Sequence, residues 1–300
     1  MDRLIQPSMF SQPFMQNALL TGTITAIVAG LVGFFVVLRG VSFAAHALGQ
    51  IGFAGAAGAV LIGVAPLWGL VVFALGGAIG LGVLGVNEHG RDATTALVLV
   101  AALGLGALFI ALNSTYATEA FSLLFGTIVG ISRDQVWQTG VLALACLVGL
   151  AILYRPLLLA TVNAQMAAAR GVPVRLLGSL FLMLVGVAAA VTIPTVGTLL
   201  IFSLMVGPAA AACYLTNRPA AAMGLAVALS LLATWVGLVI AYDTGWPIGF
   251  IISAAVALLY MGARLAGPHL PRRRLAAPAR EPAASELSSE TPARHVAGVR

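Results

Sequence analysis

Long apolar stretches recur along the whole chain and are separated by short groups of Gly, Pro and charged residues. Most stretches are about 20 residues long, the length that an α-helix needs to cross the hydrocarbon core of a bilayer. The pattern predicts transmembrane helices near 17–38, 43–64, 66–86, 93–113, 119–131, 135–154, 175–193, 196–215, 220–241 and 247–265. The stretch at 119–131 is short for a full crossing, so a tilted, partial or re-entrant segment there would reduce the count to nine.

The composition supports a membrane protein. Hydrophobic residues make up 61% of the 300 residues and charged residues only 8%, whereas about 25% of a soluble domain is charged. The 34 glycines suit close packing of helices in lipid, where small residues let backbones approach. We therefore expect an all-α integral membrane protein, a polytopic bundle of about ten transmembrane helices.

The two ends of the chain differ from its middle. Residues 1–16 form a short N-terminal segment, and the first apolar stretch is long enough to be an uncleaved first helix. The transmembrane domain is expected at 17–266. From 267 to 300 the composition changes to Pro, Ala, Arg, Glu and Ser, which predicts a disordered cytoplasmic tail. Its arginine cluster at 272–274 would anchor the last helix near the lipid headgroups.

All fifteen basic residues are Arg, and the sequence holds no Lys. A P-loop, whose lysine reaches the phosphates of a nucleotide, is therefore excluded, and we expect a transport subunit without ATPase activity of its own. The arginines stand between apolar stretches and in the tail, where anchoring at the membrane surface explains them better than nucleic-acid binding. No nucleic-acid partner is expected.

The arginines also predict an orientation, because cytoplasmic loops carry an excess of basic residues. Ten crossings with both termini in the cytoplasm would place on the inner side Arg3, Arg155, Arg170, Arg175, Arg218, Arg264, Arg272, Arg273 and Arg274, and on the outer side Arg39, Arg91 and Arg133. The expected location is the cell membrane, with the N- and C-termini cytoplasmic.

A polar stripe stands out in the second predicted helix. Ser42, His46 and Gln50 are spaced at i, i+4 and i+8, which places them on one helix face among apolar neighbours. Polar groups inside a span are costly and commonly line a pathway. A neutral imidazole there accepts a hydrogen bond or binds a metal ion. The same stripe would also fit hydrogen bonding between packed helices, and the residues alone leave both interpretations open.

Two segments between predicted spans have distinctive patterns. The loop at 157–173 is Ala-rich and ends at Gly171, which predicts a short helix outside the bilayer on the cytoplasmic side, or an ordinary interfacial helix. In the second segment, Pro194 and Gly197 interrupt an apolar region at 191–200. That break favours a plain loop, or else irregular backbone that lines a pathway.

Four stretches, taken in order along residues 14–262, resemble the permease subunits of zinc and manganese ABC importers, the ABC-3 family. They are Val-Leu-Arg-Gly-Val-Ser-Phe at 37–43, Leu-Phe-Gly-Thr-Ile-Val-Gly-Ile-Ser at 124–132, Ala-Arg-Gly-Val-Pro-Val-Arg at 169–175, and Val-Gly-Thr-Leu-Leu at 196–200 followed by Gly-Pro-Ala at 207–209. The resemblance implies the permease fold of a type II ABC importer.

The same resemblance implies partners and a cargo. The permease would pair with a second copy or a paralogue, receive energy from a separate ABC ATPase, and take its metal from an extracytoplasmic metal-binding protein. No cofactor would be permanently bound, and Zn²⁺ or Mn²⁺ would be transported. The segment before Gly171 would be the coupling helix that contacts the ATPase, with Asn163, Gln165, Arg170 and Gly171 at that contact. Asn163 stands where the family usually has an acidic residue.

The resemblance also implies a metal site on the second helix, where the family typically reads S-F-x-G-D-A-L-x-H. Here His46 replaces the family's Asp and Gln50 replaces its His, with Ser42 in a supporting place. Imidazole is a good ligand for Zn²⁺, whereas an amide oxygen suits harder ions. Loss of the carboxylate removes negative charge, so lower affinity or a different metal preference is expected.

Two other functions remain open at this level. Permeases for siderophores and vitamin B12 share the broad fold and lack the Asp and His pair, so a metal chelate is an alternative cargo. An ATP-independent channel or carrier is the other alternative, although no acidic or basic residue lies in the middle of a predicted span to couple an ion gradient.

Overall fold

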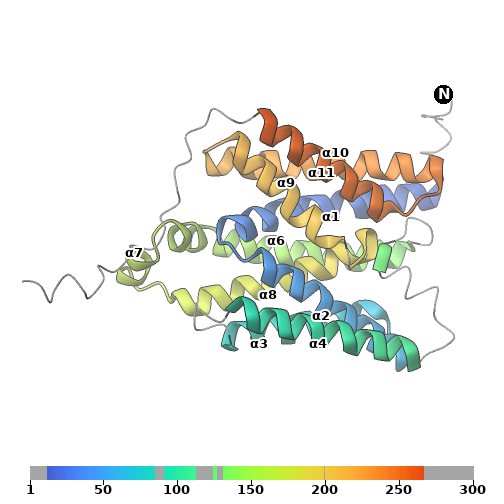
Figure 1. Cartoon of the computed structure of the whole chain (residues 1–300), viewed down its shortest axis with the longest axis horizontal. Coiled ribbons are helices and arrows are strands. Elements are labelled where there is room, and N and C mark those ends of the chain that lie inside the picture. The colour runs from blue at the N-terminus through green and yellow to red at the C-terminus, as the bar shows by residue number, and fades with distance from the viewer. Residues whose placement is uncertain (1–11, 85–90, 113–123, 127–130, 199, 267–300) are drawn as a thin grey trace, which may run out of the picture. The chain divides into compact units, whose positions relative to one another are not determined.

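The computed structural model describes residues 12–84, 91–112, 124–126, 131–198 and 200–266, and every structural statement below concerns these ranges. Within them the chain is entirely helical (Figure 1). The helices are α1 (Pro13–Leu38), α2 (Ser42–Leu61), α3 (Pro66–Leu84), α4 (Arg91–Leu112), α6 (Arg133–Val162), α7 (Ala164–Ala169), α8 (Val174–Val196), α9 (Ile201–Leu215), α10 (Pro219–Thr244) and α11 (Ile248–Ala266).

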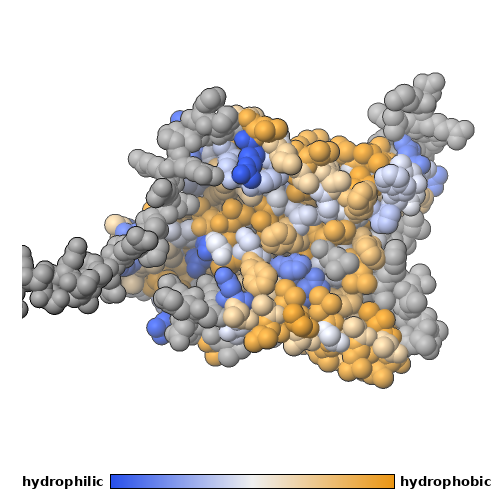
Figure 2. Space-filling model, viewed as in Figure 1, coloured by the Kyte–Doolittle hydropathy of each residue, from blue (hydrophilic) through white to orange (hydrophobic). Residues whose placement is uncertain are grey.

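The expected fold class is confirmed. Of the described helices, eight are long and apolar enough to cross a membrane, and α9 is an apolar helix of 15 residues. Together these nine helices account for nine of the ten predicted spans. Large apolar side chains such as Leu97, Leu144 and Leu258 are exposed, and apolar residues dominate the face of the bundle seen in Figure 2. Such a surface is suited to lipid rather than to water.

The helices run between two ends of the bundle. α1 and α6 begin at the same end, where the Asn17 side-chain nitrogen donates a 2.9 Å hydrogen bond to the Ile131 carbonyl oxygen. Both helices then run toward α7, and late in their course the rings of Phe35 and Tyr154 meet with their centroids 5.8 Å apart. We call the end at which α7 lies the α7 end, and the other the opposite end (Figure 1).

α4 runs in the same direction as α2, which begins at the α7 end directly after α1. A Cβ atom on Gly106 of α4 would lie 2.6 Å from the Phe53 ring, and one on Gly58 of α2 would lie 3.0 Å from the Phe109 ring. These pairs advance together along both helices, so α4 ends at the opposite end, where α6 begins. The predicted span at 119–131 lies between these two helices and falls almost entirely outside the described residues.

The first and last described helices start and finish at different ends of the bundle, whereas ten crossings would place both on one side. α10 is antiparallel to α1, because a Cβ atom on Gly30 would lie 2.7 Å from the Val227 Cα atom while Phe14 stacks on Tyr242 at 6.3 Å. α11 then returns to the α7 end. Pro13 and Ala266 therefore lie at opposite ends, since the nine long apolar helices form an odd number of passages.

Arg39 corrects the predicted distribution of charge. The loop pattern predicts it on the side away from Arg175, but its guanidinium carbon lies 5.5 Å from the centroid of the Phe181 ring, two turns into α8. Arg39 therefore belongs to the α7 end, and so does Arg91, the first residue of α4.

The corrected directions make the charge asymmetry stronger than expected. The arginines at the α7 end are Arg39, Arg91, Arg155, Arg170, Arg175, Arg218 and Arg264. In the described part of the chain, only Arg133 lies at the opposite end. The basic residues of the described ranges are thus concentrated at one end of the bundle.

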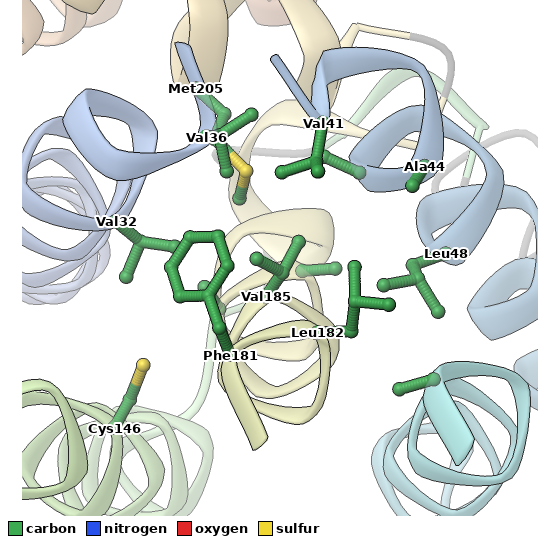
Figure 3. Close-up of a cluster of buried hydrophobic side chains, with 14 of the residues drawn as sticks. Val32, Val36, Val41, Ala44, Leu48, Cys146, Phe181, Leu182, Val185 and Met205 are labelled. Atoms are coloured by element: carbon green, nitrogen blue, oxygen red, sulfur yellow. The ribbon is translucent and has the colours of Figure 1, made fainter. Parts of the chain in front are cut away.

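The core lies where α8 packs between α1 and α2. Figure 3 shows Phe181, Leu182 and Val185 of α8 directed toward Val32 of α1 and Leu48 of α2. All five side chains are 3% exposed or less. Close packing of this kind holds membrane helices together, because burial from water contributes little between lipid-exposed segments. α8 is therefore the central helix against which α2 is held.

Candidate functional site

The three residues of the polar stripe all lie on α2, as the sequence predicted. Ser42 is the first residue of the helix, and His46 and Gln50 follow one and two turns later. Ser42 and His46 are half-buried, whereas Gln50 is only 1% exposed. The stripe therefore leads from the α7 end into the interior of the bundle.

The stripe faces the junction between α8 and α9. The His46 ring meets the Phe202 ring edge to face, with centroids 5.6 Å apart. One turn deeper, the Gln50 side-chain nitrogen donates a 3.3 Å hydrogen bond to the Thr198 carbonyl oxygen. A Cβ atom on Gly49 would lie 3.1 Å from Ile201, so a larger residue there would separate the two elements. Residues far apart in the sequence thus form one polar contact region.

Three polar atoms in this region are buried and lack a hydrogen-bond partner among the described residues: His46 Nδ1, Gln50 Oε1 and Thr198 Oγ1. The direction of the Gln50 amide follows from its partner, because a carbonyl oxygen only accepts and so leaves Oε1 unused. An unsatisfied buried polar atom costs about 1–3 kcal/mol. Three such atoms in one region indicate a candidate binding site for a polar ligand or an ion.

The side-chain atoms in this region that could bind a metal ion are all neutral. The described ranges contain no group of three or more His, Cys, Asp or Glu side chains able to hold a metal ion. His46, Gln50 and Thr198 would offer one nitrogen and two uncharged oxygens. Thr198 was not among the site residues predicted from the sequence, although its place directly after the Gly197 break was the signal that could have identified it.

The α8–α9 junction is held by backbone packing rather than being a plain loop. Gly197 adopts φ 90° and ψ 157°, a conformation essentially restricted to glycine. A Cβ atom on it would lie 2.6 Å from the Gly126 nitrogen. Gly249, at the start of α11, also packs closely, since its Cβ would lie 2.7 Å from the Phe125 carbonyl oxygen. Segment 124–126 therefore fixes the turn that presents Thr198.

A second candidate site lies at α7, within the predicted segment 157–173. Asn163 caps this short helix, since its Oδ1 atom accepts a 2.8 Å hydrogen bond from the Met166 backbone nitrogen. The helix ends at Ala169 and is followed by the C-cap Arg170 and by Gly171, which has φ 78°. Gln165 and Arg170 are exposed, and α7 projects from the bundle in Figure 1. The predicted short helix is present, but residues 157–162 belong to α6.

Known proteins match almost the whole helical region. The manganese import system permease protein ScaB of Streptococcus parasanguinis is 30% identical over 249 residues, which is 83% of this chain and 89% of the relative. The manganese transport system membrane protein MntC of Halalkalibacterium halodurans is 28% identical over 257 residues, covering 84% of this chain and 88% of the relative.

A solved structure has the same fold. A chain of PsaBC from Streptococcus pneumoniae, determined in complex with a Fab, superposes with a TM-score of 0.79 at 27% identity, covering 87% of this chain and 95% of that one. The family model described as "ABC 3 transport family" matches residues 11–266. The resemblance seen in the four sequence stretches is thereby confirmed, and the chain belongs to the ABC 3 transport family.

Proposed function

We propose that this chain is the permease subunit of an ATP-driven importer of a divalent metal ion, zinc or manganese. The observation that carries the proposal is the match over residues 11–266 to a transport family whose relatives are named as manganese permeases. The buried polar region on α2 supplies a place for the cargo. Imidazole is a ligand for transition metals, and the adjoining oxygens would complete part of the coordination.

The remaining parts of the importer would be separate chains. The sequence has no lysine and therefore no P-loop, so ATP hydrolysis would come from an ABC ATPase. A second permease copy or a paralogue would complete the path across the cell membrane. An extracytoplasmic binding protein would deliver the ion to the opposite end of the bundle.

We infer that the α7 end faces the cytoplasm. The concentration of arginines at that end, against Arg133 at the other within the described ranges, supports this orientation. α1 would then begin on the extracytoplasmic side, and α11 would end on the cytoplasmic side. The exposed face of α7, with Gln165 and Arg170, would be the contact for the ATPase.

Cysteine labelling tests the orientation and the ATPase contact together. Asp243 is exposed in the last turn of α10, at the opposite end of the bundle. In a background with Cys146 and Cys213 replaced by alanine, a membrane-impermeant thiol reagent applied to intact cells should label Asp243→Cys and not Gln165→Cys. In inverted vesicles, Gln165→Cys should react, and bound ATPase should protect it. The reverse labelling pattern would contradict the orientation. Equal reactivity with and without ATPase would contradict the role of α7.

Transport itself is tested in proteoliposomes that hold this chain with its ATPase and binding protein. We expect uptake of zinc or manganese that requires ATP and disappears when the P-loop lysine of the ATPase is replaced by alanine. Uptake that persists without ATPase activity would show a channel or carrier instead. Transport of an iron chelate, with neither free ion transported, would show a chelate permease.

A further inference from the structure

We propose that Thr198 is a specificity-determining residue of the transport site, where its hydroxyl joins His46 and Gln50 in a cation-binding set without negative charge. The inference rests on the proposed function and goes beyond it, because it adds a ligand from the α8–α9 junction and predicts which ion is favoured. Its basis is the way in which α2 meets this junction.

α2 and the α8–α9 junction pair in register. His46 meets Phe202, and one turn further along α2 Gln50 meets Thr198, one turn earlier on the other segment. The two contacts place the imidazole and the amide on the same side of α2 as the junction. A metal ion bound by His46 and Gln50 would therefore have Thr198 beside it.

The bond between Gln50 and Thr198 leaves both residues with an unused oxygen. Gln50 is 1% exposed and Thr198 is 0% exposed, so neither Oε1 nor Oγ1 reaches solvent. Buried threonines elsewhere in the bundle can satisfy themselves locally. Thr192, for example, donates a 2.6 Å hydrogen bond to the Ala188 carbonyl oxygen within α8. Thr198 follows Gly197 outside any helix, so its hydroxyl has no carbonyl oxygen one helical turn earlier to which it could donate.

Other buried hydroxyls without a partner in the described ranges belong to Thr21, Ser230 and Thr234. They lie on α1 and α10, and within the described ranges none of them is hydrogen-bonded to an imidazole or an amide. Thr198 differs because its own carbonyl oxygen holds the Gln50 amide in place. The fixed amide presents Oε1 in one direction, which is the preorganisation that a binding site needs.

The chemistry of the three donors predicts a preference. A neutral set gains no attraction from a carboxylate, and its strongest ligand is the imidazole, which suits Zn²⁺ better than Mn²⁺. Mn²⁺ depends more on oxygen donors. Removal of the Thr198 hydroxyl should therefore weaken binding of Mn²⁺ more than binding of Zn²⁺, and the intact site should favour Zn²⁺.

Equilibrium metal binding to the purified permease–ATPase complex tests this inference. Thr198→Val keeps the side-chain shape and removes the hydroxyl, Thr198→Ser keeps the hydroxyl, and Thr192→Val is a matched control that removes a buried hydroxyl already satisfied within its own helix. We expect Thr198→Val to raise the half-saturating Mn²⁺ concentration by about tenfold and to raise that for Zn²⁺ less. Thr198→Ser and Thr192→Val should match the wild type.

Several results would overturn the inference. They are no metal binding by the wild-type complex, unchanged half-saturation in Thr198→Val, an equal change in Thr192→Val, or an equal loss for both ions. If Thr198→Val does not assemble, Thr198→Ala against Thr198→Ser makes the same comparison. Uptake by the wild-type importer distinguishes failure of this inference from failure of the proposed function. Metal transport with an unaffected Thr198→Val would contradict the role of Thr198 alone, whereas absence of metal transport would contradict the proposed function.

Discussion

Replacing His46 by alanine is expected to lower ATP-dependent metal uptake by a factor of about ten to one hundred, with the permease still inserted and assembled with its ATPase. His46 provides the only imidazole of the polar region, and its Nδ1 atom is buried without a partner among the described residues. The variant removes the imidazole and leaves the Gln50–Thr198 hydrogen bond intact. Initial uptake rates of zinc and manganese in proteoliposomes measure the effect.

Phe43→Ala is the matched control, because Phe43 lies on the same helix and is 41% exposed. It should leave uptake near the wild-type rate. If His46→Ala prevents assembly instead, the residue serves helix packing. The double variant His46→Asp/Gln50→His recreates the pair typical of the family and restores a carboxylate, so it should shift preference toward manganese. An unchanged ratio of zinc to manganese uptake would contradict a ligand role for these two positions.

Replacing Gly197 by alanine is expected to destabilise the folded permease by about 2–6 kcal/mol. Its φ 90° and ψ 157° would cost an alanine about 1–3 kcal/mol. The added Cβ would also overlap the Leu124 carbonyl oxygen and the Gly126 nitrogen, and crowding of this kind costs typically about 1–3 kcal/mol. The yield of monodisperse protein after detergent extraction, and its thermal unfolding temperature, measure the loss.

Gly245→Ala separates the two causes. Gly245 has φ 70° and ψ 9°, and no heavy atom lies within 4 Å of its added Cβ, so only the backbone conformation is penalised. A smaller loss of about 1 kcal/mol is expected there. If both variants lose equal stability, the close packing of Gly197 on segment 124–126 is not what holds the α8–α9 junction.

The type and approximate length of nine described helices followed from the sequence because hydrophobic length is a local property. Nine predicted spans correspond to described helices, and the spacing of Ser42, His46 and Gln50 placed them on one face of α2. Local capping chemistry likewise marked the short helix α7 between Asn163 and Gly171.

Properties that depend on contacts between distant segments could not be predicted from the sequence. The sequence did not reveal that Arg39 packs on Phe181, so Arg39 was predicted on the side away from Arg175. Thr198 was missed for the same reason. It forms a hydrogen bond with a residue 148 positions away, and the Gly197 break marks its position in the sequence but not its partner.

α8 connects the two candidate sites, because it begins shortly after α7 and ends at the α8–α9 junction. Its 23 residues extend about 35 Å from the segment just after α7 to the residue before Gly197. Pro194 lies in its last turn, so the helix is uninterrupted over most of its length and is weakened only beside the junction. A displacement of its first turn would therefore be passed along the helix to the α8–α9 junction, where the Thr198 carbonyl oxygen holds the Gln50 side chain.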